Sequence, residues 1–326
     1  MKKIYGIKEC FMSGDVAAQT GKLFGDLWHK LDGDQYEESV GLFARRFEAN
    51  GFDLGWFQGK ACLDAGCGGG RYTVAMGRLG AREAVGVDVS EAGIADARQR
   101  ATGEANVRFQ VASVLDLPLE DDSFDFVCSS GVLHHTTDLD KGLDEITRVL
   151  RPGGKLYLLL YGSGGLRWAA SGALRPIAQD LGYDFMDAAI AGSGLPANNR
   201  RNFLDDFFVP IVTFIDWETL HGKLSARGFG TIERWMKGRF DHEASPLLQR
   251  EEVEKMVRIF AAAKSKAESA DAHVLGLAEK GLQEAESYLS RIDELIAAHD
   301  EGRIGADELE REVIGEGNHR VLADKS

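Results

Sequence analysis

The feature that most constrains the fold is a regular alternation of short apolar runs with segments of helical pattern, beginning at residue 60. The apolar runs cover residues 61–64, 84–88, 107–111, 124–128, 155–160 and 231–236. The intervening helical segments cover residues 71–79, 90–102, 140–150 and 216–227. Strands that alternate with helices indicate a parallel sheet covered by helices on both faces. The sequence therefore predicts a doubly wound α/β domain.

The remaining sequence divides into further segments around this pattern. Residues 1–58 have the spacing of two amphipathic helices, which we interpret as an N-terminal lid. The expected core covers residues 59–161 and ends with residues 216–244. Residues 162–215 interrupt the alternation for longer than the connections usual in α/β proteins, so we expect this insertion to have a function of its own.

Residues 245–326 are predicted to be an acidic, helical C-terminal extension. Leu275, Leu282, Leu289 and Ile296 are seven residues apart, and acidic residues outnumber basic ones in this segment. Three heptads are marginal for an independent coiled coil. Two interpretations remain open: these helices pack on their own domain, or they form a homodimer or another partner interface.

Composition and charge restrict the partners and the compartment. The chain of 326 residues has a net charge of −14, which argues against general nucleic-acid binding. Its four cysteines show neither zinc-site spacing nor the density of a disulfide scaffold, so we expect a reducing cytoplasm. The longest apolar run, residues 156–161, is far shorter than the roughly 20 residues that span a bilayer, so no membrane association is expected.

The most specific segment is Leu63-Asp64-Ala65-Gly66-Cys67-Gly68-Gly69-Gly70, between a predicted strand and a predicted helix. Glycines at such a turn let a ligand lie against main-chain N–H groups at the helix start. A dinucleotide-binding GxGxxG pattern would need a further glycine where Arg71 or Thr73 stands. The pattern present is Asp-x-Gly-x-Gly-x-Gly.

This pattern resembles motif I of the class I S-adenosylmethionine (SAM)-dependent methyltransferases, in particular the ubiquinone/menaquinone-methylase-like type that acts on small molecules. The resemblance continues through Asp88, through residues 124–135 and through Leu150-Arg151-Pro152-Gly153-Gly154. It implies a mostly parallel seven-stranded Rossmann-like sheet, SAM as cofactor and S-adenosylhomocysteine as product. Asp88 stands where the family's acidic residue accepts the ribose hydroxyls, a role that suits an acceptor-only carboxylate.

The resemblance also implies a set of cofactor-binding residues. These are Asp64, Gly66, Cys67, Gly68, Asp88, Val89, Ser113, Val114 and Ser130, with Tyr36 from the N-terminal lid. One position departs from the family pattern, because Ser113 stands where an aspartate commonly holds the adenine amino group. A serine accepts a hydrogen bond without charge, so the adenine contact is expected to be weaker or to involve the main chain.

Three residues are predicted near the reacting methyl group. His135 and His134 lie in the loop after the fourth strand, where an imidazole can remove a proton from the methyl acceptor. Tyr161 ends the fifth strand, where open α/β sheets bind ligands. Each has an alternative role in packing or in lining the cofactor. No metal is expected in the reaction.

The resemblance implies that the insertion of residues 162–215 forms a substrate cap, so acceptor recognition is predicted there. Arg200 and Arg201 are suited to a carboxylate or phosphate, and Asp205 and Asp206 to an amine or hydroxyl. The alternative is an Arg/Asp network on the surface.

The predicted reaction is methyl transfer to an oxygen or nitrogen of a small molecule, such as a metabolite, a natural-product precursor or a glycan precursor. Two alternatives remain, namely a methylase of RNA, DNA or protein and a SAM-binding scaffold without catalysis. Ser129-Ser130-Gly131-Val132 differs from the Asn/Asp-Pro-Pro-aromatic motif that is typical of nucleic-acid nitrogen methylases.

Overall fold

The computed structural model describes residues 16–28, 33–237, 243 and 245–326. The chain divides into two compact units. The described residues of the α/β unit are those up to 161, 210–237 and 318–326, and the described residues of the helical unit are 162–209, 243 and 245–317.

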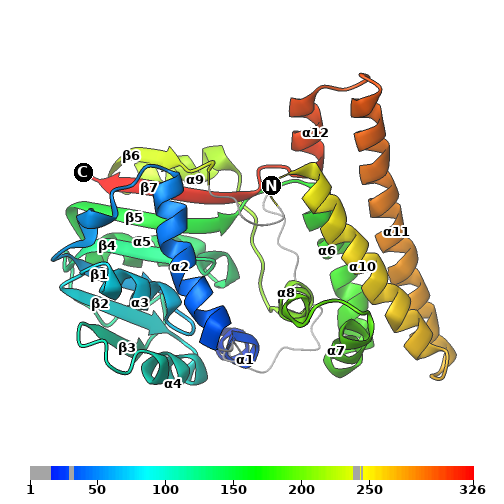
Figure 1. Cartoon of the computed structure of the whole chain (residues 1–326), viewed down its shortest axis with the longest axis horizontal. Coiled ribbons are helices and arrows are strands. Elements are labelled where there is room, and N and C mark those ends of the chain that lie inside the picture. The colour runs from blue at the N-terminus through cyan, green and yellow to red at the C-terminus, as the bar shows by residue number, and fades with distance from the viewer. Residues whose placement is uncertain (1–15, 29–32, 238–242, 244) are drawn as a thin grey trace. The chain divides into compact units, whose positions relative to one another are not determined.

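The α/β unit is built on one seven-stranded sheet (Figure 1). Its strands are β1 (Ala61–Ala65), β2 (Glu83–Asp88), β3 (Val107–Val111), β4 (Phe124–Ser130), β5 (Leu150–Tyr161), β6 (Phe229–Arg234) and β7 (Asn318–Lys325). Their spatial order is β3-β2-β1-β4-β5-β7-β6. Strands β1 to β5 pair in parallel, whereas β7 runs antiparallel to both of its neighbours. The predicted doubly wound, mostly parallel sheet is therefore confirmed.

The helices of this unit either precede β1 or lie between strands of the sheet. They are α1 (Val16–Trp28), α2 (Gly33–Ala49), α3 (Arg71–Arg78), α4 (Glu91–Arg100), α5 (Leu139–Val149) and α9 (Trp217–Ser225), with short 3-10 turns η2 (Leu54–Phe57) and η3 (Leu133–His135). The side chains of Ser90, Asp138 and Asp216 cap α4, α5 and α9 by accepting a main-chain N–H of the first turn. These three helices begin within one residue of the expected helix starts.

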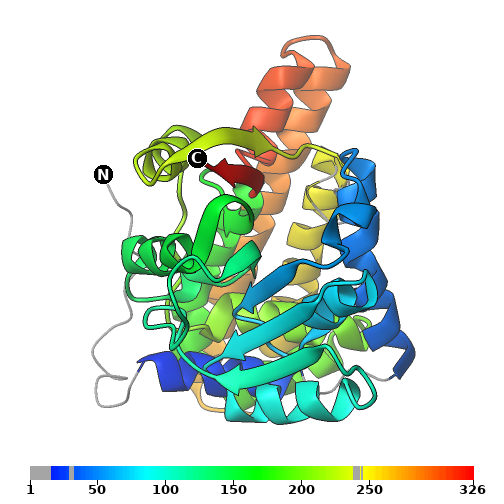
Figure 2. The ribbon, with the colours of Figure 1, turned by 90° about the vertical axis from the view of Figure 1, so that its left-hand side faces the viewer.

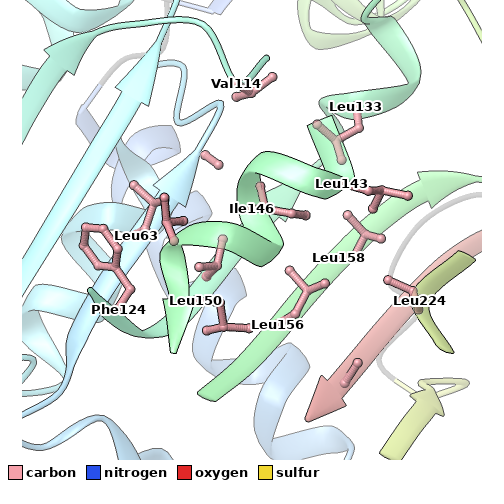
Figure 3. Close-up of a cluster of buried hydrophobic side chains, with 14 of the residues drawn as sticks. Leu63, Val114, Phe124, Leu133, Leu143, Ile146, Leu150, Leu156, Leu158 and Leu224 are labelled. Carbon is pink, nitrogen blue, oxygen red and sulfur yellow. The ribbon is translucent and has the colours of Figure 1, made fainter. Parts of the chain in front are cut away.

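The two faces of the sheet bury two separate hydrophobic clusters, because side chains alternate along each strand. Leu156 and Leu158 of β5 point into the first cluster, with Leu143 and Ile146 of α5 (Figure 3). Tyr157 of β5 lies in the second cluster, which is rich in aromatic side chains from α2, η2 and β4. Both clusters are buried by helices, as expected for a doubly wound fold.

The helical unit contains α6 (Leu166–Leu181), α7 (Tyr183–Gly192), α8 (Ala197–Phe208), α10 (Pro246–Ala267), α11 (Ala272–Asp300) and α12 (Ala306–Val313). Helices α10 and α11 form a long hairpin and lie side by side in both views (Figures 1 and 2). A Cβ atom on Gly281 would lie only 2.2 Å from the Phe260 ring, so a glycine is required where these two helices cross. Ala278, Ala285 and Ile292 of α11 are buried within this unit.

Two expectations about the C-terminal part were wrong. The core does not end with residues 216–244, and residues 245–326 are not helical throughout, because residues 318–325 form β7 between β5 and β6. The expected insertion and extension do not fold as separate segments, since most of both belong to the helical unit. Among the described residues, no helix is both long enough and apolar enough to cross a membrane.

Candidate active site

The candidate site lies at the carboxyl ends of β1, β2, β4 and β5, which share one edge of the sheet. The strand order changes direction between β1 and β4, and open α/β sheets bind ligands outside such a point. Asp64, Asp88, Ser130 and Tyr161 lie at or next to the ends of these four strands. The fold therefore brings together residues that are separated by almost 100 positions in the sequence.

The glycine turn after β1 is held by hydrogen bonds to β2 and leaves open space at Gly68. The N–H groups of Gly66 and Cys67 both donate to the Val87 carbonyl, at 2.8 and 2.9 Å, which ties the turn to β2. Gly66 has φ +87°, and a Cβ atom there would lie 2.3 Å from Val132. Gly68 has φ +51° and open space where a Cβ would stand. Gly66 thus permits close packing with the loop after β4, whereas Gly68 leaves room against the main chain.

Asp88 organises the turn as well as ending β2. Its Oδ2 accepts the Gly68 N–H and its Oδ1 accepts the Ser90 N–H, both at 2.8 Å. Burial raises the pKa of this carboxyl above its ordinary value, partly offset by these hydrogen bonds. Each carboxylate oxygen can accept more than one donor, so the carboxylate retains capacity for the predicted ribose hydroxyls.

Asp64 lies beneath the turn and is 2% exposed. Its Oδ2 accepts a hydrogen bond from the Thr73 hydroxyl at 2.8 Å, which joins the end of β1 to α3. Burial raises the pKa of Asp64 to about 6 despite this bond. Cys67 is also buried, and burial raises the pKa of its thiol, so the thiol is protonated at neutral pH.

The two predicted adenine contacts, Ser113 and Val114, have different surroundings. The Ser113 hydroxyl accepts the Leu115 N–H at 3.1 Å and so shapes the turn after β3. Val114 is buried and belongs to the first hydrophobic cluster, as does Leu133 (Figure 3). A contact between Val114 and a cofactor would therefore involve its main chain rather than its side chain.

Helix α1 packs directly on the loop after β2, which the sequence analysis missed. A Cβ atom on Gly21 would lie 3.1 Å from Val89, and one on Gly25 would lie 2.6 Å from the Ser90 hydroxyl. These two glycines, four residues apart on one helix face, let α1 approach the Asp88 loop closely. The Gly-x-x-x-Gly spacing in α1 was the available signal.

Tyr36 of α2 is 4% exposed and belongs to the second hydrophobic cluster. The Arg100 guanidinium lies over its ring at 4.6 Å, and burial raises the pKa of its phenol to about 12. Within the described part of the chain its hydroxyl has no hydrogen-bond partner. Its predicted contact with the cofactor stays a prediction.

Both histidines of η3 pack against the end of β5. The His134 ring is fully buried and stacks on Tyr161, with 3.9 Å between ring centroids. The centroids of the His134 and His135 rings are 4.1 Å apart. Among the described residues neither ring nitrogen of His134 has a hydrogen-bond partner, and burial lowers its pKa well below the ordinary value. His134 is therefore a neutral side chain at physiological pH.

His135 is held in one orientation by a residue far away in the sequence. Its Nδ1 lies 2.8 Å from the Ile211 carbonyl oxygen, and the Thr213 N–H donates to the His134 carbonyl at 2.9 Å. A carbonyl only accepts, so the proton of a neutral imidazole stands on Nδ1. The Nε2 atom of His135 is then the basic nitrogen. Sequence reasoning had no signal for this partner.

The four predicted acceptor residues lie on α8, in the helical unit. Arg200 forms an exposed ion pair with Asp187 of α7. Asp206 is buried and pairs with Arg167 of α6, whereas Asp205 and Arg201 are half-buried. Arg200 thus matches the alternative of a surface network, and Asp206 belongs to a buried one.

Comparison with known proteins agrees with this geometry. A family model described as "Methyltransferase domain" matches residues 63–158, which contain the glycine turn, Asp88 and both histidines. The sheet also resembles the solved structure of the [4+2]-cyclase SpnF, with a TM-score of 0.51, 19% identity and 98% of each chain covered. At this identity the likeness concerns the fold alone.

Two curated relatives also support assignment to a methyltransferase family. A demethylmenaquinone methyltransferase of Clavibacter sepedonicus is 32% identical over 176 residues, which cover 54% of this chain and 67% of that protein. A protein with the same name from Staphylococcus aureus is 33% identical over 109 residues, covering 33% of this chain and 45% of that protein. The chain thus spans two thirds of the first relative and less than half of the second. It belongs to the class I SAM-dependent methyltransferases.

Proposed function

We propose that the chain transfers the methyl group of SAM to an oxygen or nitrogen atom of a small molecule. The names of two relatives, demethylmenaquinone methyltransferase, denote a small-molecule acceptor. Ser129-Ser130-Gly131-Val132 at the end of β4 also lacks the Asn/Asp-Pro-Pro-aromatic motif that is typical of nitrogen methylases of nucleic acids. Both observations favour a small acceptor over RNA or protein.

The residues of the glycine turn fit the proposed cofactor. Open space above Gly68, together with its positive φ, allows a ligand to approach the main chain. Asp88 is already oriented by two main-chain N–H groups, so it would accept ribose hydroxyls without reorganisation. Bound SAM supplies a methyl group that is already activated by its positive sulfur. Asp64, beneath the turn, adds a negative charge that favours binding of a cation.

The hydrogen bond from His135 Nδ1 to the Ile211 carbonyl is the observation that carries the chemical part of the proposal. Because this bond fixes the tautomer, Nε2 is the atom that removes the proton from the acceptor hydroxyl or amine. His134 has no such orienting bond within the described part of the chain, and it packs on Tyr161. We therefore assign the base to His135 and a packing role to His134 and Tyr161.

Cofactor binding is tested first, by calorimetry with SAM on the full chain. We expect measurable heat for the native chain and a strong loss of affinity for Asp88→Ala, because the ribose would lose its acceptor. The exposed Arg200→Ala variant, in the helical unit, serves as the matched control and should bind normally. No binding heat for the native chain at millimolar SAM would overturn the proposal.

The acceptor is then sought by following S-adenosylhomocysteine production with small-molecule, RNA and protein fractions tested separately. Product formed only with RNA or protein would refute the small-molecule assignment.

The base is tested with His135→Asn, whose side-chain amide retains a donor toward Ile211 but has no basic nitrogen. We expect kcat to fall about 100-fold to 10,000-fold with little change in SAM affinity. Tyr161→Phe keeps the aromatic packing and should stay within about threefold of the native rate, since the base lies elsewhere. Activity of His135→Asn within that same range would exclude His135 as the base.

A further inference from the structure

Residues 211–215 form a short segment that runs beside η3, the turn that carries both histidines. The Ile211 carbonyl accepts from Nδ1 of His135 at 2.8 Å. Two residues further along, the Thr213 N–H donates to the His134 carbonyl at 2.9 Å. Main-chain contacts at every second residue are the pattern of a strand edge. The place of the Ile211 carbonyl, and with it the tautomer of His135, therefore depends on how this segment is held.

The segment is anchored to the sheet at its last residue, Ile215. The Ile215 N–H donates to the Tyr161 carbonyl of β5 at 3.1 Å. The Ile215 carbonyl accepts from Nε2 of His319 in β7 at 2.8 Å. The His319 side chain is fully buried, and its ring centroid lies 5.8 Å from that of Trp217. Strand β7 thus contacts the segment through a buried side chain.

The polarity of His319 is unusual for its place in β7. Side chains alternate along a strand, so His319 shares a face with Val321 and Ala323, which both lie in the first hydrophobic cluster. A leucine at this position would be buried without cost, whereas an imidazole loses its hydration. Buried polar groups are as a rule hydrogen-bonded, and the Ile215 carbonyl is the partner of this one. The bond to Ile215 is therefore what a histidine adds here over an apolar residue.

We propose that His319 is a positioning residue for the base. It holds Ile215 at one end of the segment, and the Ile211 carbonyl at the other end keeps the proton of His135 on Nδ1. Without this anchor the Ile211 carbonyl would shift, and the proton would also occupy Nε2, the nitrogen that has to take the proton of the methyl acceptor. The inference rests on the proposed role of His135 and extends it to the last strand of the chain.

Nitrogen-15 NMR of the full chain, labelled at histidine, tests this without a methyl acceptor. Protonated and unprotonated imidazole nitrogens resonate at well-separated frequencies, and among the eight histidines the His135 signals are those missing from His135→Asn. At about pH 8, where an ordinary imidazole is neutral, we expect the proton of native His135 on Nδ1. In His319→Leu we expect the ratio of Nδ1–H to Nε2–H to fall about tenfold, the factor that corresponds to one hydrogen bond.

Two amide variants keep the test decisive even if His319→Leu does not fold. The His319→Gln side chain can still reach the Ile215 carbonyl with an N–H donor and should keep the native ratio. The His319→Asn side chain is also polar but shorter, and it should behave as His319→Leu does. A native ratio in His319→Leu or His319→Asn overturns the proposal, and so does a low ratio in His319→Gln or in the native chain.

Val321→Ala is the matched control, because Val321 lies on the same face of β7. It should lower the melting temperature by opening a cavity, yet leave the tautomer ratio of His135 unchanged. A ratio as low as in His319→Leu would show that any weakening of β7 disturbs His135, and would refute a specific role for His319.

SAM calorimetry on the same preparations separates this inference from the proposed function. No heat with SAM in the native chain overturns the proposed methyl transfer, whereas the NMR measurement still decides the role of His319. A native ratio in His319→Leu together with normal SAM binding overturns this inference alone. We expect His319→Leu to bind SAM with nearly native affinity, and a strong loss of affinity would refute an effect confined to the base.

Discussion

Replacing Asp64 with asparagine is the sharpest test of the charge beneath the glycine turn. The folded chain raises the pKa of Asp64 to about 6 from an ordinary value of 3.8, mainly through burial. Below pH 3.8 the carboxyl is protonated whether the chain is folded or unfolded, so it carries no penalty. Between pH 3.8 and 6 the unfolded chain releases the proton first, and stability falls as pH rises. The difference in pKa corresponds to about 3 kcal/mol, fully expressed above pH 6.

Asp64→Asn should remove this penalty, since an amide does not titrate and still accepts from Thr73. We expect the free energy of unfolding of the variant, relative to the native chain, to rise by up to about 3 kcal/mol between pH 4 and pH 7. Urea titrations at steps across this range, followed by circular dichroism, measure the difference directly.

A control of opposite sign is available at Asp216, whose pKa is lowered by hydrogen bonds from Thr219. Asp216→Asn should lose stability relative to the native chain at neutral pH, and this loss should shrink as pH falls. Parallel stability curves for Asp64→Asn and the native chain would refute the account of Asp64.

Three glycine substitutions, two of them with a matched control, give further predictions. Gly66→Ala should lower the free energy of unfolding by about 2 kcal/mol or more in denaturant titrations, because its φ is positive and the added methyl group clashes with Val132. The control Gly59→Ala also has a positive φ but open space around it, so it should cost only the backbone strain of about 1 kcal/mol. Gly281→Ala should lower the free energy of unfolding by about 1–3 kcal/mol, because the added methyl group meets Phe260. Gly276→Ala, on the same helix but with open space, should raise it by up to about 1 kcal/mol. Equal effects of the two substitutions would contradict the close crossing of α10 and α11. Gly25→Val should weaken SAM binding measured by calorimetry by displacing α1 from Ser90, and unchanged affinity would exclude α1 from the cofactor site.

The sequence predicted the part of the site that is determined locally. A buried strand, a glycine turn and a helix start lie within residues 61–78, so their chemistry can be read without knowledge of the fold. Asp88 was assigned from the family resemblance, as the acidic residue that ends the next strand. Its hydrogen bond to Gly68 was not predicted, since that bond depends on how the two loops meet.

The remaining features depend on contacts between distant segments. His135 is oriented by Ile211, 76 positions away, and the buried partner of Asp206 is Arg167, 39 positions away. Strand β7 was missed because it begins with the polar residues Asn318, His319 and Arg320, after a long helical region. These polar residues are buried, which a pattern of hydrophobic residues does not indicate.

The position of β7 has a consequence for folding. Both β5 and β6 pair with β7, yet the ribosome synthesises helices α10, α11 and α12 before β7. Until β7 is made, β5 presents an unpaired edge, and such edges favour aggregation. Lys325 then donates from Nζ to main-chain carbonyls of Thr147 and Leu150, linking the end of β7 to the start of β5. We infer that the sheet closes only once β7 has been synthesised, and that a chain lacking β7 would aggregate even with its glycine turn intact.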